Sequence, residues 1–426
     1  MEKLGAVRQM LETGALDAAL SRLTGGDPRR DRAAGVLDGF RQTFGAGEDT
    51  PVTLCSAPGR TEICGNHTDH QHGHVLAASV NVDFLACAAP NGTNTIRFQS
   101  EGWPLVEVRL DGKGPRPEEN ETTASLVRGM AELAAGRGFP VAGFDAYAVS
   151  DVLPGSGLSS SAACEVLLGV IVNHLFCADS FTPVEIAQMG QGAENAYFGK
   201  PSGLMDQMAS SVGGAVAIDF ADPARPEVKA LPVDLAGLGY ALCIIDSGAS
   251  HADLTGEYAA VPREMGAVAA HFGKQFLREV TEGQVLADLP ALRKAAGDRA
   301  VLRALHFFAD DARVEREAAA LAGGDMETFL ALVDQSGRSS WELLQNITPA
   351  GAVAEQAMAV ALTVARRALR GKGACRVHGG GFAGTIQAFV PLDSLDQFRA
   401  ETEGALGAGS CHVLSIRPVG GCVVCP

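Results

Sequence analysis

A run of small residues in the first half of the chain has the composition of a phosphate-binding loop. Glycines let successive backbone amides converge on one point, and the apolar stretch behind the run predicts a helix whose N-terminus is directed at the same point. Serine hydroxyls beside these amides are ligands for Mg²⁺. The run therefore predicts a site for the phosphates of ATP, although a glycine turn capped by serine has the same residues. Its members are Gly155, Ser156, Gly157, Leu158, Ser159, Ser160, Ser161 and Ala162.

The better-known nucleotide-binding glycine motifs do not explain this run. A Walker A loop requires a lysine directly after its second glycine, and the sequence has no such pattern. Gly379, Gly381 and Gly384 do match the spacing G-x-G-x-x-G, but residues 385–390 after them have the composition of a strand. A dinucleotide site requires a helix there. We therefore expect these glycines to join two strands and to let the backbone approach the phosphate loop or the substrate closely.

The densest group of polar side chains lies between residues 59 and 74. A guanidinium, an amide, imidazoles and a carboxylate on one glycine-punctuated loop suit hydrogen bonding to a polyhydroxylated ligand such as a sugar. The imidazoles and the carboxylate also suggest zinc, but they lack the spacing of a known zinc motif. A sugar site is therefore the preferred interpretation. The side chains are Arg60, Asn66, His67, Asp69, His70, His72 and His74.

The ten cysteines predict buried thiols and no metal centre. Most of them, such as Cys87, Cys164 and Cys243, have apolar neighbours, among which a free thiol behaves as a small hydrophobic residue. Cys422 and Cys425 form a single C-x-x-C pair, and a structural zinc site requires a second pair.

Four segments resemble the sequence motifs of galactokinases and of the wider GHMP kinase superfamily. Residues 57–69 resemble the galactokinase signature, and the Gly/Ser run resembles the second GHMP motif. Residues 202–207 (Ser-Gly-Leu-Met-Asp-Gln) resemble the galactokinase segment that carries the catalytic aspartate. Residues 377–384 resemble the third GHMP motif. The four motifs follow one another in the order found in the family, between about residues 51 and 420.

The resemblance implies ATP-dependent phosphorylation of the anomeric hydroxyl of galactose. It implies that Asp206 acts as a base or orienter beside that hydroxyl, and that Arg60 neutralises charge on the transferring phosphoryl group. Glu194 and Ser161 would hold Mg²⁺, and the Gly/Ser run, residues 155–162, would line the phosphates. Because phosphoryl transfer passes through a loose transition state, one carboxylate beside one guanidinium suffices. The sugar would be bound by Asn66, His67, Asp69, Gly203 and Tyr258.

Three departures from the family pattern bear on the substrates. Asn66 replaces a usual glutamate near the terminal hydroxymethyl group of the sugar; because an amide does not repel a second carboxylate, galacturonate is the leading alternative substrate. The tryptophan that galactokinases often carry ahead of residues 127–129 is missing, so the preference for ATP over GTP rests on the family resemblance. His378 replaces a usual threonine in the third motif.

Two other function classes fit the same superfamily. A mevalonate or homoserine kinase is disfavoured by the polar loop from Arg60 to Asp69. A catalytically silent sugar sensor is disfavoured because both Arg60 and Asp206 are retained, and a sensor requires binding but not phosphoryl transfer.

Length and charge limit the partners and the architecture. With 426 residues, the chain is long enough for two packed lobes, and its net charge of −16 without a basic run argues against nucleic acid. The N-terminus lacks a secretory signal, and no segment has the apolar length of a membrane span, so we expect a cytoplasmic protein. The oligomeric state is not predicted.

The catalytic groups require a fold that joins both halves of the chain. We expect an α+β, two-lobed GHMP kinase fold with mixed sheets flanked by helices and the active site in the cleft between the lobes. The expected parts are a helical extension at residues 1–50, including one helix over residues 2–23, an N-terminal lobe at 51–225 and a C-terminal lobe at 226–426. Strands are predicted at 52–56, 75–88, 95–98, 106–110, 144–149, 215–219, 240–246, 374–378, 385–390 and 411–416. Helices are predicted at 124–135, 160–177, 183–197 and 203–212.

Overall fold

The N-terminal extension of the computed structural model is helical, as the apolar spacing predicts. The structure describes residues 1–152, 157–249 and 254–426. After the short strand β1 (Glu2–Lys3), the extension forms α1 (Leu4–Thr13), α2 (Asp17–Thr24) and α3 (Arg30–Phe44). The prediction of one helix over residues 2–23 is wrong, because Gly14 adopts a left-handed conformation (φ 79°) that ends α1.

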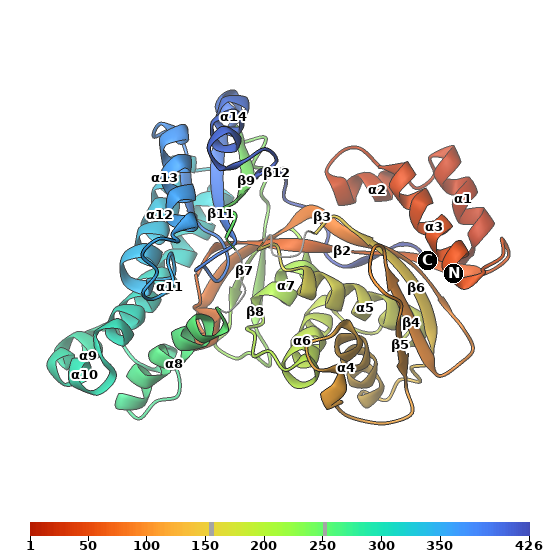
Figure 1. Ribbon diagram of the computed structural model, residues 1–426, viewed down its shortest axis with the longest axis horizontal. Helices are drawn as coiled ribbons and strands as arrows, with labels where there is room; N and C mark the ends of the chain where they lie inside the picture. Colours follow the sequence, from red (N-terminus) through yellow and green to blue (C-terminus); the bar gives the residue numbers. More distant parts are fainter. Residues whose placement is uncertain (153–156, 250–253) are drawn as a thin grey trace.

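In the described part of the chain, nine strands form one large sheet (Figure 1). Its main path is β1–β2–β3–β6–β4–β5, β13 pairs with β2, and β7 joins β3 to β8. All pairs are antiparallel except β4 with β6. The strands after β1 are β2 (Pro51–Cys64), β3 (His74–Pro90), β4 (Thr95–Ser100), β5 (Val106–Arg109), β6 (Phe144–Ser150), β7 (Ala215–Asp219), β8 (Glu227–Leu231) and β13 (Cys422–Cys425).

Strand β3 explains how this sheet is covered on both faces. Successive side chains of a strand point to opposite faces. Phe84, Ala86 and Ala88 belong to the core under the helices that follow, whereas Leu85 and Cys87 pack against the N-terminal helices. The strand is therefore apolar on both sides, because α1 to α3 cover the face opposite to α4 (Thr123–Gly136), α5 (Ser160–Phe176) and α6 (Pro183–Ala193) (Figure 1).

The central helix of the N-terminal half is α5 (Ser160–Phe176). Its residues are buried on all sides from Ala162 to Asn173, which is the pattern of a helix enclosed by other elements. It packs against β2 and β3 of the sheet and against the helices around it. These are α4 (Thr123–Gly136), α6 (Pro183–Ala193) with the π-helical turn η3 (Glu194–Phe198), and α7 (Met205–Val212).

A second, four-stranded sheet organises the C-terminal half, in the order β10–β11–β9–β12 among the described residues. Its strands are β9 (Tyr240–Asp246), β10 (Ala374–Val377), β11 (Thr385–Pro391) and β12 (Cys411–Leu414). The helices are α8 (Thr255–His271), α9 (Glu282–Ala287), α10 (Leu289–Ala296), α11 (Asp298–Gly323), α12 (Met326–Ser339), the π-helical turn η5 (Ser340–Leu344), α13 (Ala357–Leu369) and α14 (Leu395–Leu406). Short 3₁₀ turns are η1 (Asp69–Gln71), η2 (Pro117–Glu119), η4 (Leu277–Glu279) and η6 (Leu392–Ser394).

Several strands differ from the sequence prediction. Strand β2 runs on to Cys64, past the expected end at residue 56, so the first part of the expected polar loop is strand. The sequence of this part suggests a loop because it contains charged residues such as Arg60 and Glu62, but the fold buries both. Strands β8 and β13 were not predicted, and β13 contains the C-x-x-C pair. Because both join the large sheet, strands from either side of residue 225 share it, and the lobe boundary stays a prediction.

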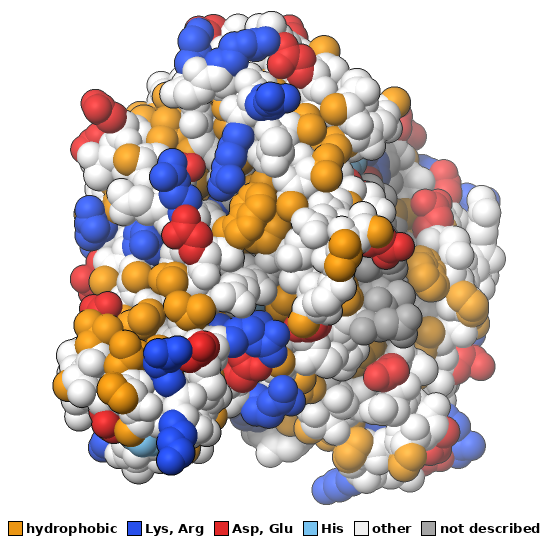
Figure 2. All heavy atoms as spheres, turned by 60° about the vertical axis from the view of Figure 1, so that its left-hand side comes forward, with side chains coloured by type: hydrophobic (Ala, Val, Ile, Leu, Met, Phe, Trp, Pro, Cys, Tyr) orange, Lys and Arg blue, Asp and Glu red, His pale blue; other side chains and the backbone are white. Residues whose placement is uncertain are grey.

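The surface carries charges of both signs. On the face that Figure 2 turns forward, Lys and Arg side chains are scattered among Asp, Glu and hydrophobic side chains. In the described ranges, no helix is long and apolar enough to cross a membrane.

Candidate active site

Arg60 and Asp206 lie face to face, as the resemblance implies. Arg60 donates from Nε to Asp206 Oδ1 (2.7 Å) and from Nη2 to Asp206 Oδ2 (2.8 Å). Ser159 Oγ donates to the same Oδ2 at 2.7 Å. The Asp206 side chain is 29% exposed, so a ligand can reach this carboxylate. The structure thus brings together a guanidinium from β2, a hydroxyl from the start of α5 and a carboxylate from α7.

Local backbone features hold these three groups. The pairing of β2 with β3 is irregular between Pro58 and Arg60, and the Arg60 amide donates to Leu158 O (3.0 Å). Such an irregularity redirects a side chain out of the regular alternation. Asp206 lies in the first turn of α7, where the helix dipole favours a carboxylate.

The electrostatics keep Asp206 ionised. Burial acts to raise the pKa of the Asp206 carboxyl, but the charge and hydrogen bonds of Arg60 and the hydroxyl of Ser159 outweigh it and hold the pKa below its ordinary value. An aspartate with a lowered pKa is a weak base. It is suited to orienting a hydroxyl and to accepting its proton late in the transfer.

The described end of the proposed phosphate loop meets Arg60 directly. Arg60 Nη1 also donates to the carbonyl of Gly157, and α5 starts at Ser160 with Ser159 in a left-handed conformation (φ 58°). The predicted helix behind the loop is confirmed. Leu158 and Ala162 are buried, which leaves only their backbone for a phosphate. Gly155 and Ser156 lie outside the described residues.

The two proposed Mg²⁺ ligands are neighbours. Ser161 Oγ donates to Glu194 Oε1 at 3.3 Å, and the Glu194 side chain is almost fully buried. Ser202 Oγ (2.6 Å) and Gln207 Nε2 (2.9 Å) both donate to Glu194 Oε2. One carboxylate and one hydroxyl, both hard oxygen donors, fit a Mg²⁺ that takes its other ligands from water and phosphate.

Lys200 is a functional candidate that the sequence interpretation missed. Its Nζ lies 2.9 Å from Glu194 Oε1, on the same oxygen that Ser161 contacts. Burial acts to lower the pKa of the Lys200 ammonium, but Glu194, Asp206 and Glu165 raise it above its ordinary value. The position of Lys200, six residues before Asp206 and just before the motif at residues 202–207, is the signal that could have identified it.

Asp69 and Gly203 define the proposed sugar side of the site. A Cβ on Gly203 would lie 1.8 Å from Asp69 Oδ2, so the two residues approach more closely than any side chain at 203 permits. Asp69 Oδ1 accepts from the backbone amide of His70 (2.9 Å). The carboxylate is therefore oriented by its own turn, η1, and pressed against the segment that carries Asp206.

His67 and Tyr258 both contact the third glycine motif. His67 Nε2 donates to Gly380 O (3.0 Å), and Tyr258 Oη donates to Gly381 O (2.8 Å). Burial lowers the pKa of His67 to about 3 and raises that of Tyr258 to about 12, so both side chains are neutral at pH 7. The motif itself connects β10 to β11, which confirms that a strand and not a helix follows Gly384.

Asn66 is placed differently from what the resemblance implies. Its Nδ2 donates to Glu62 Oε1 (2.9 Å) and Gly379 O (2.7 Å), and its Oδ1 accepts from Asn346 Nδ2 (2.7 Å) and from Ser340 Oγ (3.4 Å). The side chain is fully buried and its hydrogen-bonding capacity is used by the protein. The contacts of the Asn66 side chain are thus with the protein, and its contact with a sugar stays a prediction.

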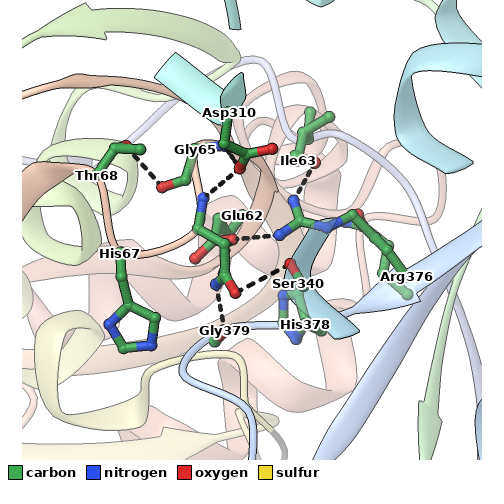
Figure 3. A network of polar contacts seen from close by, with 12 residues as sticks. Glu62, Ile63, Gly65, His67, Thr68, Asp310, Ser340, Arg376, His378 and Gly379 are labelled. Atoms are coloured by element: carbon green, nitrogen blue, oxygen red, sulfur yellow. Dashed lines mark hydrogen bonds and ion pairs between the residues drawn. The ribbon is translucent and has the colours of Figure 1, made fainter. Parts of the chain in front are cut away.

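The charge argument for an acidic substrate also changes. Figure 3 shows Glu62, Gly379 and Ser340 around the centre of this polar network, with Arg376 directed at Glu62. The Glu62 carboxyl accepts a hydrogen bond from the Asn66 amide, so an acidic group is present at this place although residue 66 is an asparagine.

The remaining histidines discussed above have separate partners and do not form one cluster. His72 stacks on Phe276, and His74 lies between Asp311 and Asp219. His378 contacts Thr61 Oγ1 (3.1 Å) and Thr385 Oγ1 (3.0 Å), and burial with Arg60 nearby holds its pKa well below the ordinary value. Within the described residues, no three His, Cys, Asp or Glu side chains converge as a zinc site would require.

The class of protein follows from the fold and the family models. Residues 125–214 match the GHMP kinases N terminal domain, and residues 38–90 match the galactokinase galactose-binding signature. The mevalonate kinase of L. major has the same fold at 14% identity, with a TM-score of 0.57 over 87% of this chain and 97% of that one. The protein is a GHMP kinase in fold, and the predicted α+β fold class is confirmed.

Closer relatives narrow the class. The crystal structure of Lactococcus lactis galactokinase complexed with galactose aligns with a TM-score of 0.77 and 25% identity, over 92% of this chain and 99% of that one. The galactokinase of Streptomyces coelicolor is 30% identical over 378 residues, 88% of this chain and 93% of that protein. The Homo sapiens galactokinase is 30% identical over 398 residues, 91% of this chain and 95% of that protein. The chain belongs to the galactokinase family.

Proposed function

We propose that this protein transfers the γ-phosphoryl group of ATP to the anomeric hydroxyl of galactose. The observation that carries the proposal is the hydrogen-bonded pair of Arg60 and Asp206. Ser159 also donates to Asp206. Asp69 lies against Gly203, which precedes Asp206 by three residues. A phosphate site and a polyol site thus meet at one carboxylate. Membership of the galactokinase family supplies the sugar and the nucleotide.

In the proposed reaction, the anomeric oxygen forms a bond to the γ-phosphorus as the bond to the β,γ-bridging oxygen breaks. ADP leaves with the bridging oxygen, and the hydroxyl proton passes to Asp206 and then to water. Arg60 offsets the negative charge of the transferring group. Since the transition state is loose, orientation and charge stabilisation by Asp206 and Arg60 contribute more than proton abstraction.

Mg²⁺ is proposed to bind at Glu194 and Ser161, where it would neutralise charge on the phosphates. Lys200 shares the Glu194 oxygen and adds a second cation beside the same site. Gln207 holds the other oxygen, and it also donates to Glu165 Oε2 (2.9 Å), a buried carboxyl whose pKa burial raises well above its ordinary value. Gln207 thereby orients the proposed metal-binding carboxylate through its second oxygen.

Galactose is preferred over galacturonate for a physical reason. The hydrogen-bonding groups of the Asn66 amide are occupied by Glu62, Gly379, Asn346 and Ser340, so the amide offers no donor to a substrate carboxylate. A cytoplasmic location and the absence of nucleic-acid partners remain predictions from composition.

The test is an ADP-release assay with Mg²⁺ and ATP across hexoses and hexuronic acids, with the product examined by ³¹P NMR for an anomeric phosphate. Turnover of galactose to the 1-phosphate is expected. Turnover of galacturonate without galactose would overturn the proposal, and nucleotide and sugar binding without turnover would indicate a sensor.

A further inference from the structure

The loop that carries His67 and Asp69 is anchored by the C-terminal half of the chain. The amides of Gly65 (3.2 Å) and Asn66 (2.9 Å) both donate to Asp310 Oδ2 on α11. The carbonyl of Asn66 accepts from His306 Nε2 at 3.0 Å, while His306 Nδ1 contacts Ser339 Oγ (2.8 Å). The backbone of this sugar loop, residues 65–69, is thus held on one side by the side chains of Asp310 and His306.

The Asn66 side chain fixes the other side of the loop. It spans three segments: Glu62 on β2, Gly379 in the third glycine motif, and Asn346 after η5. Asn346 Nδ2 also donates to Gly380 O (3.1 Å), the carbonyl that accepts from His67. The Asn66 amide, together with that of Asn346, therefore sets the distance between the sugar loop and the glycine segment, residues 379–381.

The charges around this amide are already balanced. Arg376, which is fully buried, donates from Nη2 to Glu62 Oε1 (2.8 Å), and Arg313 pairs with Asp310. Burial raises the pKa of Glu62 to about 7 even though Arg376 and Arg60 oppose it. A carboxylate at position 66 would add a further buried charge, and the described contacts of residue 66 include no cation.

We propose that Asn66 is a positioning residue, which holds the sugar loop against the glycine segment and must remain uncharged because Glu62 already places a carboxylate there. The role of the loop in binding galactose rests on the proposed function. The anchoring itself does not, since it is defined by contacts within the protein.

The experiment compares the wild type with Asn66→Asp, which keeps the size of the side chain and removes both amide donors. The KM and the calorimetric Kd for galactose are expected to rise about 10- to 100-fold, the loss that follows from breaking buried hydrogen bonds to a charged partner. Because the described contacts of Asn66 include neither Arg60 nor Asp206, kcat is expected to change less than threefold. A purely structural defect would instead lower the apparent kcat or the amount of folded protein.

The pH dependence adds a second readout. Once protonated, the carboxyl introduced by Asn66→Asp regains one donor, so the ratio of the variant KM to the wild-type KM should fall as pH decreases from 8.5 to 6. The ratio cancels the titration of groups distant from residue 66 and reports the introduced carboxyl together with Glu62, which lies against it. The titratable and charged groups that face this amide or its Glu62 partner are Arg60, Glu62, His67, Asp69, His306, Asp310, Arg313, Glu317, Arg376 and His378.

The matched control is Asn173→Asp. Asn173 is also buried and its amide makes two bonds to Phe181, donating to O (3.1 Å) and accepting from N (3.0 Å). It lies 13 residues along α5 from Ser160, about 20 Å at 1.5 Å per residue. This variant should lose stability but keep the wild-type KM for galactose.

Hydrogen exchange separates failure of this proposal from failure of the proposed function. Without any sugar, peptides covering residues 65–69 and 379–381 should exchange faster in Asn66→Asp than in the wild type. Unchanged exchange in both segments would overturn the positioning role, whatever the substrate is. If Asn66→Asp does not fold, Asn346→Ala, which removes one contact of Asn66 Oδ1, should show a smaller effect of the same kind, and an unchanged KM and exchange there would overturn it.

Discussion

Arg60 and Asp206 make two parallel hydrogen bonds of 2.7 and 2.8 Å across 146 residues of sequence. A second pair, Arg97 with Asp145, has the same fork geometry on the large sheet, at 2.7 and 2.5 Å. Only the first pair also contacts Ser159 and the carbonyl of Gly157. The two pairs allow the chemical role of an Arg–Asp fork to be separated from its structural role.

We therefore expect Asp206→Asn to lower kcat by about 10²- to 10⁴-fold, the range for loss of a positioned acid–base group. Asp145→Asn should leave kcat within about twofold and lower only stability, by about 1 kcal/mol. Steady-state kinetics and urea unfolding of both variants measure this. Equal kinetic losses in the two would contradict a catalytic role for Asp206.

The close approach of Gly203 to Asp69 predicts a steric effect on sugar binding. In Gly203→Ala, the new Cβ would lie 1.8 Å from Asp69 Oδ2, so the carboxylate or the segment before Asp206 has to move. We expect kcat/KM for galactose to fall at least about tenfold, since a displacement of 1 Å costs about 10²-fold in a positioned site. Gly266→Ala, on α8 with open space around it, is the control and should be neutral.

The Glu194 side chain predicts how the enzyme depends on Mg²⁺. Glu194→Gln removes the negative charge that pairs with Lys200 and is proposed to bind Mg²⁺, so the Mg²⁺ concentration for half-maximal rate should rise about tenfold or more. Titration of Mg²⁺ at fixed ATP measures the shift. The exposed Glu327→Gln on α12 serves as control, and an unchanged Mg²⁺ requirement in Glu194→Gln would exclude this residue as a ligand.

His74 predicts a pH-dependent contribution to stability. The hydrogen bond to Asp311 (3.0 Å) opposes burial and, with Asp219 nearby, raises the pKa of His74 above its ordinary 6.5. A raised folded pKa means that the ionised imidazole stabilises the fold fully below pH 6.5, and that this contribution is lost as pH rises through the folded pKa.

In His74→Gln, the free energy of unfolding should therefore be about 1 kcal/mol lower than in the wild type at pH 6. The difference should shrink at pH 9. Urea unfolding at both pH values checks it, and a difference that grows with pH would reverse the sign of the argument. The groups facing the imidazole are Asp219, Arg278, Asp311 and Glu315.

Asp83 ties both ends of the chain to the large sheet. It accepts from Arg417 Nη1 (2.8 Å), near the C-terminus, and from Arg32 Nη1 (2.6 Å) on α3. Arg417→Leu should lower the free energy of unfolding by about 3 kcal/mol, because one partner of a buried ion pair is removed. Arg225→Leu, from an exposed pair with Asp222, should change it by less than about 1 kcal/mol. Calorimetric and urea unfolding decide between the two outcomes.

The local patterns of the sequence were sufficient for most strands and for helices α4 to α7. The helix behind the Gly/Ser run and the strand after Gly384 follow from apolar spacing and glycine position. The prediction failed where contacts between distant segments favour a strand although the local sequence does not. Strand β2 continues through Arg60 and Glu62 because Asp206 and Arg376 supply their partners, and β13 becomes a strand because β2 offers it an edge.

The sequence by itself determined the types of chemical group and their order: a guanidinium, a serine run, a carboxylate and a glycine turn, which define a phosphoryl-transfer site of the galactokinase kind. Only the tertiary structure decided which of the neighbouring polar groups are enclosed by the protein. Asn66 and Asp69 lie three residues apart, yet the first is enclosed by Glu62, Asn346 and Gly379, and the second meets Gly203. Hydrogen-bond satisfaction depends on neighbours distant in sequence, and a linear motif does not contain them.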